Sequence, residues 1–144
     1  MKLYTIGFTK KDARTFFGLL IKNNVKTVID IRLNNHSQLA GFTKGKDLEY
    51  FLEAIAGIKY HYFIQAAPEE SLLKNWQDKK ITWSEYETAY KAMLVKRNIL
   101  DRVDLKILDD GCLLCSEPTP DQCHRRLLAE YFKETIPDLE IRHI

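Results

Sequence analysis

The feature that most constrains the fold of this chain is an alternation between short apolar segments and segments with helical periodicity. The apolar segments are rich in β-branched residues and end at glycine or polar residues, which is typical of buried strands. They cover residues 3–7, 25–32, 58–63, 112–115 and 139–144. Strands that alternate with helices at this spacing form βαβ units. We therefore predict an α/β fold: a single domain over residues 1–144, with a mainly parallel sheet of about five strands and helices on both faces. This is a three-layer arrangement of the Rossmann-like or flavodoxin-like kind.

Two of the intervening segments have a clear helical pattern. Residues 13–21 and residues 48–55 each place their apolar side chains on one face of a helix. Thr9, with Asp12 three residues later, is a weak capping signal for the first helix. Gly57 follows the second helix at the position where a C-terminal cap is expected.

Two further helices are predicted from their capping residues. Residues 82–85 (TWSE) match a capping box, so a helix should begin at Thr82. Residues 119–122 (TPDQ) offer threonine at the N-cap, proline at N1 and glutamine at N3, which predicts a helix from about Pro120. We expect irregular structure over residues 68–80, and a further turn or two after Asn98.

Ligands of parallel α/β sheets bind outside the carboxyl ends of the strands. Reading the sequence at the ends of the predicted strands therefore gives a first set of candidate site residues. They are Gly7, Phe8 and Thr9, Asp30 and Arg32, Phe63, Ile64 and Gln65, Cys115 and Glu117, and His143.

Composition and charge restrict the class of protein. A chain of 144 residues can bury a single core. No uncharged run approaches the roughly 18 residues of a membrane span, and the N-terminus has no signal-peptide pattern. We expect a cytoplasmic protein with no membrane partner. A net charge of +2 does not indicate a nucleic-acid partner. Three cysteines in one short segment indicate reduced thiols rather than a disulfide framework. No motif indicates a cofactor, and the oligomeric state is not given by the sequence.

The segment of residues 112–126 (CLLCSEPTPDQCHRR) holds all three cysteines. One interpretation is a metal site, because Cys112, Cys115, Cys123 and His124 offer four soft ligands. However, side chains alternate along a strand, so Cys112 and Cys115 should point to opposite faces of the sheet. This geometry disfavours a metal site with four ligands.

A second interpretation is a reactive thiol. If a helix begins near Pro120, Cys123 lies in its first turn, where the helix dipole and Arg125 favour the thiolate. Glu117 is then placed to exchange a proton, and Cys115 to act as a resolving thiol. The same helix start is also suited to bind a phosphate or carboxylate group.

A third interpretation is purely structural. His124 lies at helical spacing with Leu127, Leu128 and Tyr131, so it is compatible with a hydrogen-bonded core histidine. Cys112 is best explained by core packing, because free cysteines are among the most buried residues. The aromatic residues Tyr86, Tyr90, Trp76 and Trp83 are better explained as core and rim than as a platform for stacking bases.

Several motifs together resemble a known family. The chain contains YTIG, VIDIR followed by Ser37, then Phe42, GIKY, LCSE, CHRR and a terminal HI. In this order, from Tyr4 to Ile144, it resembles the domain-of-unknown-function 488 (DUF-488) family of small bacterial and archaeal proteins. The most specific part is Cys115-x-Glu117 followed by Cys123-His124-Arg125. The resemblance implies an α/β fold and no established reaction, with a site formed by Asp30, Arg32, Ser37, Cys115, Glu117, Cys123, His124 and Arg125.

The chain departs from the pattern of this family at three places. Gly7-Phe8-Thr9 stands where the family usually has a Gly-His-Ser-like turn. The proline usual near Asn35 is missing, and Gln65-Ala66-Ala67 replaces a Gly-Gly loop. These departures lie at or near the predicted strand ends and therefore bear on the substrate.

The hypothesis drawn from the sequence is an enzyme that acts on a phosphate-bearing or otherwise anionic small molecule, such as a nucleotide. Cys115 or Cys123 is its nucleophile or redox thiol, and Glu117 and His124 transfer protons. The substrate-binding residues are Asp30, Arg32, Ser37, Arg125 and Thr9. One alternative is a non-catalytic module that binds a nucleotide, nucleic acid or protein at the same edge. Another is a metal-binding protein that uses Cys115, Cys123 and His124.

Overall fold

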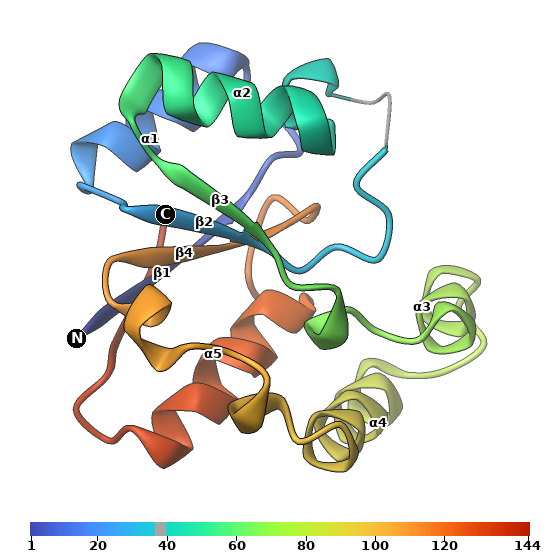
Figure 1. The fold of residues 1–144 in the computed structure, drawn as a ribbon. Helices are drawn as coiled ribbons and strands as arrows, with labels where there is room; N and C mark the ends of the chain where they lie inside the picture. The colour runs from blue at the N-terminus through green and yellow to red at the C-terminus, as the bar shows by residue number, and fades with distance from the viewer. Residues whose placement is uncertain (37–39) are drawn as a thin grey trace.

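A computed structural model of the chain describes residues 1–36 and 40–144. Its centre is a parallel five-stranded sheet (Figure 1), formed by β1 (Lys2–Gly7), β2 (Thr27–Asp30), β3 (Lys59–Tyr62), β4 (Gly111–Cys115) and β5 (Glu140–His143). The strand order is β3-β2-β4-β1-β5, and every neighbouring pair is parallel. All strands therefore end at the same edge, and β4 lies in the middle of the sheet. The predicted parallel sheet is confirmed.

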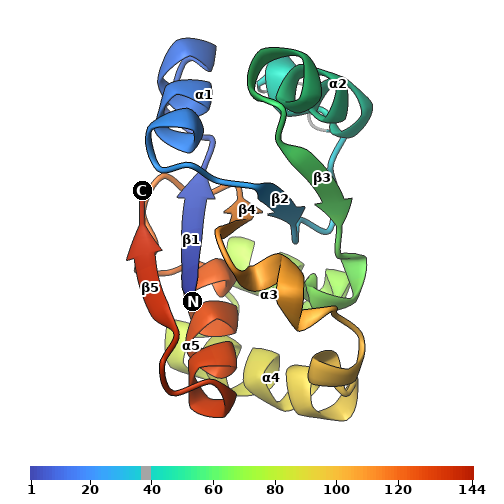
Figure 2. The same ribbon diagram turned by 60° about the vertical axis from the view of Figure 1, so that its left-hand side comes forward.

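Helices cover both faces of the sheet, which gives three layers (Figures 1 and 2). Helices α1 (Ala13–Lys22) and α2 (Gly45–Ala56) lie on one face, and α4 (Trp83–Lys96) and α5 (His124–Thr135) on the other. Two apolar clusters fill the spaces between the layers. Cys112 and Leu114 belong to the cluster beneath α1 and α2, whereas Leu113 belongs to the cluster beneath α4 and α5. The predicted α/β fold with helices on both faces is therefore confirmed.

The helix ends follow local sequence signals at two of the predicted places. Gly57 has φ of 64° and caps α2 in the left-handed conformation. The capping box of α4 is complete, because the Glu85 amide donates to Thr82 Oγ1 and the Thr82 amide donates to Glu85 Oε1. At α1, Asp12 rather than Thr9 is the N-cap, and its carboxylate accepts from the Thr15 amide at 2.7 Å.

The prediction of irregular structure over residues 68–80 is wrong, because α3 (Glu70–Gln77) forms there. This helix has no fully buried residue and packs mainly on α4 through Trp76. Its apolar stripe is too short to be distinguished from a loop by periodicity. After Asn98, the expected turns are the 3₁₀ segments Ile99–Asp101 and Leu105–Leu108. Within the described residues, none of the helices is long and apolar enough to cross a membrane.

The start of the last helix also differs from the prediction. Helix α5 begins at His124 with Cys123 as its N-cap, and residues 119–122 form a turn instead of the first helical turn. Side chains satisfy two carbonyl groups of the segment between β4 and α5: the Arg125 guanidinium donates to the Glu117 carbonyl, and the Arg126 guanidinium to the Asp121 carbonyl. With these side-chain contacts in place, the capping signal at Thr119 does not decide where the helix begins.

Candidate active site

The candidate site lies at the carboxyl edge of the sheet, where β4 ends between β1 and β2. Cys115 is the last residue of β4 and pairs in register with Gly7 of β1. Arg32 follows β2 on one side, and the Arg125 guanidinium reaches β1 on the other side through Thr5 Oγ1 at 3.3 Å. The two arginines are 3% and 1% exposed. The fold therefore places Cys115 between two buried positive charges.

A cavity of about 220 Å³ opens at this edge. Its lining includes Arg32, Cys115, Glu117, Cys123 and His124 from the sheet edge, and Trp76 and Trp83 from the helices. This volume is smaller than the pockets of about 300 to 1,000 Å³ that hold drug-sized ligands. The cavity therefore suits a small molecule, or one end of a larger one.

The side chains of Cys115 and His124 are in direct contact. Cys115 Sγ lies 3.5 Å from His124 Nδ1, and His124 Nε2 lies 2.9 Å from the Ile31 carbonyl oxygen. Because a carbonyl oxygen only accepts hydrogen bonds, Nε2 carries a hydrogen, and Nδ1 is the ring nitrogen that faces the thiol. The interpretation of His124 as a hydrogen-bonded core histidine agrees with the structure, since the ring is buried and contacts the Ile31 carbonyl. Its role in proton transfer stays a prediction.

The three thiols differ in their acidity. Burial by itself raises the pKa of Cys115, but the hydrogen bond with Cys123, the charge of Arg125 and the backbone amides of Glu117 and Ser116 outweigh it. The pKa of Cys115 is therefore lowered. Burial and the hydrogen bond with Cys115 raise the pKa of Cys123, and His124 only partly opposes this increase.

The expectation that Cys123 is the thiol with a lowered pKa is wrong. It depended on a helix that begins near Pro120, whereas Cys123 is the N-cap residue of α5 and is only 2% exposed. Cys112 is fully buried on the opposite face of the sheet, and burial raises its pKa. Its interpretation as core packing therefore agrees with the structure.

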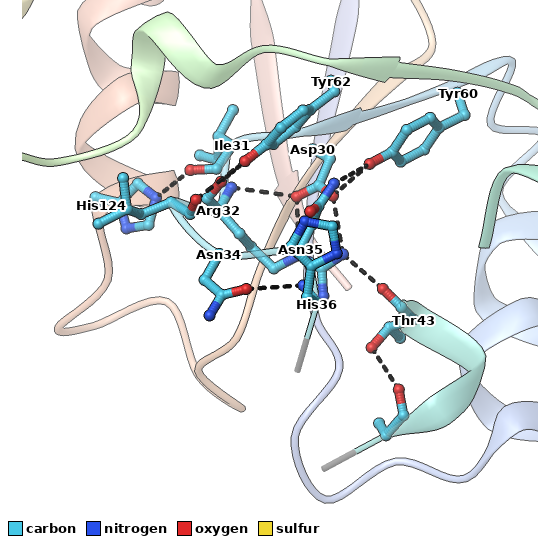
Figure 3. A network of polar contacts seen from close by, with 12 residues as sticks. Asp30, Ile31, Arg32, Asn34, Asn35, His36, Thr43, Tyr60, Tyr62 and His124 are labelled. Carbon is cyan, nitrogen blue, oxygen red and sulfur yellow. Dashed lines mark hydrogen bonds and ion pairs between the residues drawn. The ribbon is translucent and has the colours of Figure 1, made fainter. Parts of the chain in front are cut away.

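Arg32 is held by a buried polar network (Figure 3). Its Nε and Nη2 atoms donate to the Asp30 carboxylate at 2.9 and 2.8 Å, and Nη2 also donates to the Thr43 carbonyl at 2.6 Å. The Tyr60 hydroxyl donates to the same carboxylate at 2.7 Å, and the Tyr62 hydroxyl donates to the Arg32 carbonyl at 2.9 Å. The guanidinium is thereby fixed in both position and orientation.

One donor of Arg32 remains open. The Nη1 atom is buried and has no hydrogen-bond partner among the described residues. The guanidinium carbon lies 5.3 Å from the ring centre of Phe8, one of the positions where the chain departs from its family pattern. Since buried donors are normally paired, an acceptor from a ligand is the natural partner for Nη1.

The other predicted site residues are only partly brought together. Arg125 does not line the cavity, and instead donates to the Glu117 carbonyl at 2.5 Å and contacts Cys123 Sγ at 3.7 Å. Thr9 is joined to the site through its amide, which donates to the Ser116 carbonyl. Asp30 is neutralised by Arg32. His143 contacts Thr5 on the β5 side, and Ser37 lies outside the described residues.

The network also contains residues that sequence reasoning missed. Tyr60 and Tyr62 support Asp30 and Arg32 from the neighbouring strand β3. Their spacing of two residues places both on the same face of that strand, and this signal was available in the sequence. Thr43 contributes a backbone carbonyl, for which no sequence signal exists.

Three residues of the site are also arranged as possible metal ligands. The ligand atoms of Cys115, Cys123 and His124 all lie within 4.8 Å of one another. Two thiolates and one imidazole, with a fourth position open to a cavity, are a set that zinc accepts in enzymes. Cys112 is on the other face of the sheet, so it cannot join these three residues as a fourth metal ligand.

Fold and site together define a parallel α/β protein with a buried cysteine–histidine pair at the carboxyl edge of its sheet. A family model described as domain of unknown function DUF488 matches residues 12–132. The chain belongs to this family, and the resemblance found from the motifs is confirmed. No curated protein and no solved structure matches the chain.

Proposed function

We propose that this protein is an enzyme that uses the Cys115 thiolate as a nucleophile toward a small anionic substrate. The observation that carries the proposal is the contact between Cys115 Sγ and His124 Nδ1, with the other ring nitrogen fixed on the Ile31 carbonyl. This is the arrangement of an activated nucleophile, in which a third group orients the base.

Each part of the site has a role in such a reaction. The thiolate attacks an electrophilic centre of the substrate, so that a bond from Cys115 sulfur forms and the bond to the leaving group breaks. The protonated His124 ring gives its proton to the leaving group. Arg32 Nη1 binds the anionic part of the substrate, and Arg125 with the amides of Ser116 and Glu117 stabilises the thiolate before attack.

The pH dependence of thiol alkylation tests the nucleophile. Because the pKa of Cys115 is lowered, its thiolate should persist at a lower pH than that of an ordinary thiol, and its reaction with iodoacetamide should have a midpoint below that of an ordinary thiol. Peptide mapping by mass spectrometry assigns each modified residue. Cys112→Ser is the control that leaves the site intact, whereas Cys115→Ser should abolish the alkylation that occurs at low pH. A midpoint for Cys115 at or above that of an ordinary thiol contradicts the proposal.

Binding of inorganic phosphate or a nucleoside monophosphate tests the anion site. Arg32→Lys keeps the charge beside Asp30 but removes the open Nη1 donor. A hydrogen bond to a charged group contributes about 1.5 to 3 kcal/mol, so the dissociation constant measured by calorimetry should rise roughly tenfold or more. Arg142→Lys is the matched control, because Arg142 pairs with Glu140 on the surface and does not line the cavity. Equal affinities for the two variants speak against Arg32 as the anion-binding residue.

Metal binding is the second candidate function, and the close approach of the three ligand atoms favours it. Under this alternative, protein purified without chelator contains stoichiometric zinc, which His124→Ala removes. Bound metal also protects both Cys115 and Cys123 from alkylation. Under the nucleophile proposal, elemental analysis finds substoichiometric metal and Cys115 alkylates freely.

A further inference from the structure

We infer that Cys115 and Cys123 are a redox modification site, at which the two thiols form a reversible disulfide. The two sulfur atoms lie within 4.8 Å of each other, and both are buried. Both residues line the same cavity at the carboxyl edge of the sheet. The inference rests on the proposed function in one respect, because Cys115 is the thiol that reacts first in both.

The local structure leaves the Cys123 side chain available for this reaction. Cys123 is the N-cap residue of α5, but its side chain makes no capping hydrogen bond to the helix. Its sulfur lies beside Cys115 and His124, and Arg125 Nη1 is 3.7 Å from it. The segment between the two cysteines, residues 116–122, contains no helix or strand. A rotation of Cys123 toward Cys115 therefore breaks no helical hydrogen bond and does not require β4 to move.

The chemistry needs a hydroperoxide as oxidant. The Cys115 thiolate attacks the terminal oxygen of the peroxide, the O–O bond breaks, and Cys115 becomes a sulfenic acid while water or an alcohol is released. Cys123 then loses its proton to His124 or solvent and attacks the Cys115 sulfur. The S–S bond forms, the S–O bond breaks, and the hydroxide takes up a proton to leave as water. An external dithiol reverses the reaction and is itself oxidised.

The pair is specific because the third cysteine is separated from it. Cys112 is fully buried beneath α1 and α2, on the face of the sheet opposite to α5, and it does not line the cavity. A peroxide molecule is small enough for a cavity of about 220 Å³ and reaches only the other two thiols. Cys112 is therefore an internal control.

The consequence is a site that is switched off by oxidation. In the disulfide, the Cys115 sulfur has no proton to exchange with His124. It cannot form a thiolate and therefore cannot attack a substrate. It is also protected from further oxidation to the irreversible sulfinic acid. Reduction restores the nucleophile.

The experiment uses the full chain, reduced and then exposed to hydrogen peroxide. Free thiols are alkylated under denaturing conditions and located by peptide mapping, with and without later reduction by dithiothreitol. We expect two of the three thiols to disappear and to return on reduction, with one peptide pair linking Cys115 to Cys123. Cys112→Ser should form the same disulfide, so that both of its thiols disappear and return on reduction. Cys123→Ser should instead trap a sulfenic acid at Cys115, which reacts with dimedone.

The outcomes separate this inference from the proposed function. If Cys115 alkylates at low pH but peroxide yields only its sulfinic acid with Cys123 still free, the disulfide is refuted and the nucleophile stands. A disulfide that forms although Cys115 alkylates no faster than an ordinary thiol supports the modification site and contradicts the nucleophile. A linkage that involves Cys112 overturns the inference.

Discussion

At the scale of single residues, the candidate site depends on a buried ion pair. Arg32 and Asp30 are 3% and 0% exposed, and their side chains meet through two hydrogen bonds. Tyr60 adds a third contact to the carboxylate, and burial together with Asp30 raises the pKa of its own hydroxyl. Because each charge is taken out of water, each depends on the other for its neutralisation.

Substitution of Asp30 tests this dependence. Asp30→Asn leaves the Arg32 charge buried without a counter-ion, so the free energy of unfolding should fall by about 3 to 5 kcal/mol. Glu140→Gln is the matched control, since Glu140 pairs with Arg142 on the surface, where solvent screens the pair and its contribution to stability is small. Urea denaturation followed by circular dichroism measures both. Equal losses for the two variants argue that the buried pair is not a determinant of stability.

The sequence pointed to several residues of the candidate site but not to the order of acidity of its thiols. Strand ends and motifs pointed to Arg32, Cys115, Glu117 and His124, all of which line the cavity. The choice between Cys115 and Cys123 as the acidic thiol depends on which sulfur receives amide hydrogen bonds and which one donates. Those contacts arise from the path of the turn between β4 and α5, and local sequence does not determine that path.

At the scale of elements, the end of a helix is predicted correctly where the capping residues contact only each other and lie a few residues apart. The capping box of α4 is formed by Thr82 and Glu85 alone, and it was predicted correctly. The start of α5 was not, because Arg125 and Arg126 bond to carbonyl groups of the turn before it. Helix α3 was missed for a different reason, since its few apolar residues pack against α4 without being fully buried.

The α4 capping box supplies a quantitative test. Thr82→Ala removes the acceptor for the Glu85 amide and should lower the free energy of unfolding by about 1 kcal/mol. Thr88→Ala, at an exposed position inside the same helix, should leave stability unchanged or raise it slightly, because alanine has the higher helix propensity. Thermal unfolding of both variants measures the difference. A Thr88 variant as unstable as the Thr82 variant excludes the cap as the cause.

At the scale of the whole molecule, the strand order brings the site together. Arg32 follows β2 and Thr5 belongs to β1, and the two strands become neighbours of β4 only in the folded sheet. The sequence predicted parallel strands and a common edge for their ends. It did not predict which strand lies in the middle, because a given alternation of strands and helices is compatible with several orders.

Close packing at this edge is tested through Gly7. A Cβ atom at Gly7 would overlap the Glu117 carbonyl oxygen and approach Arg125 Nη1. Gly7→Ala should therefore destabilise the fold by about 1 to 3 kcal/mol and displace the turn that follows Cys115. Loss of the low-pH alkylation of Cys115 reports that displacement.

Gly18→Ala is the matched control for this change. A Cβ atom at Gly18 meets no atom within 4 Å, and the residue is exposed inside α1. Alanine there should raise stability by about 0.5 to 1 kcal/mol through its helix propensity. If Gly7→Ala is tolerated equally well, the contact between β1 and the turn after β4 is not close.

Both tryptophans of the chain belong to the wall of the cavity, Trp76 from α3 and Trp83 from α4, with ring centres 5.2 Å apart. Indole emission depends on the polarity around the ring, and no other tryptophan contributes to the signal. The molecule therefore carries its own optical reporter. Titration of an unlabelled compound should change the emission spectrum only when that compound enters the cavity beside the sulfur. Tryptophan fluorescence can therefore be used to screen compounds for the substrate.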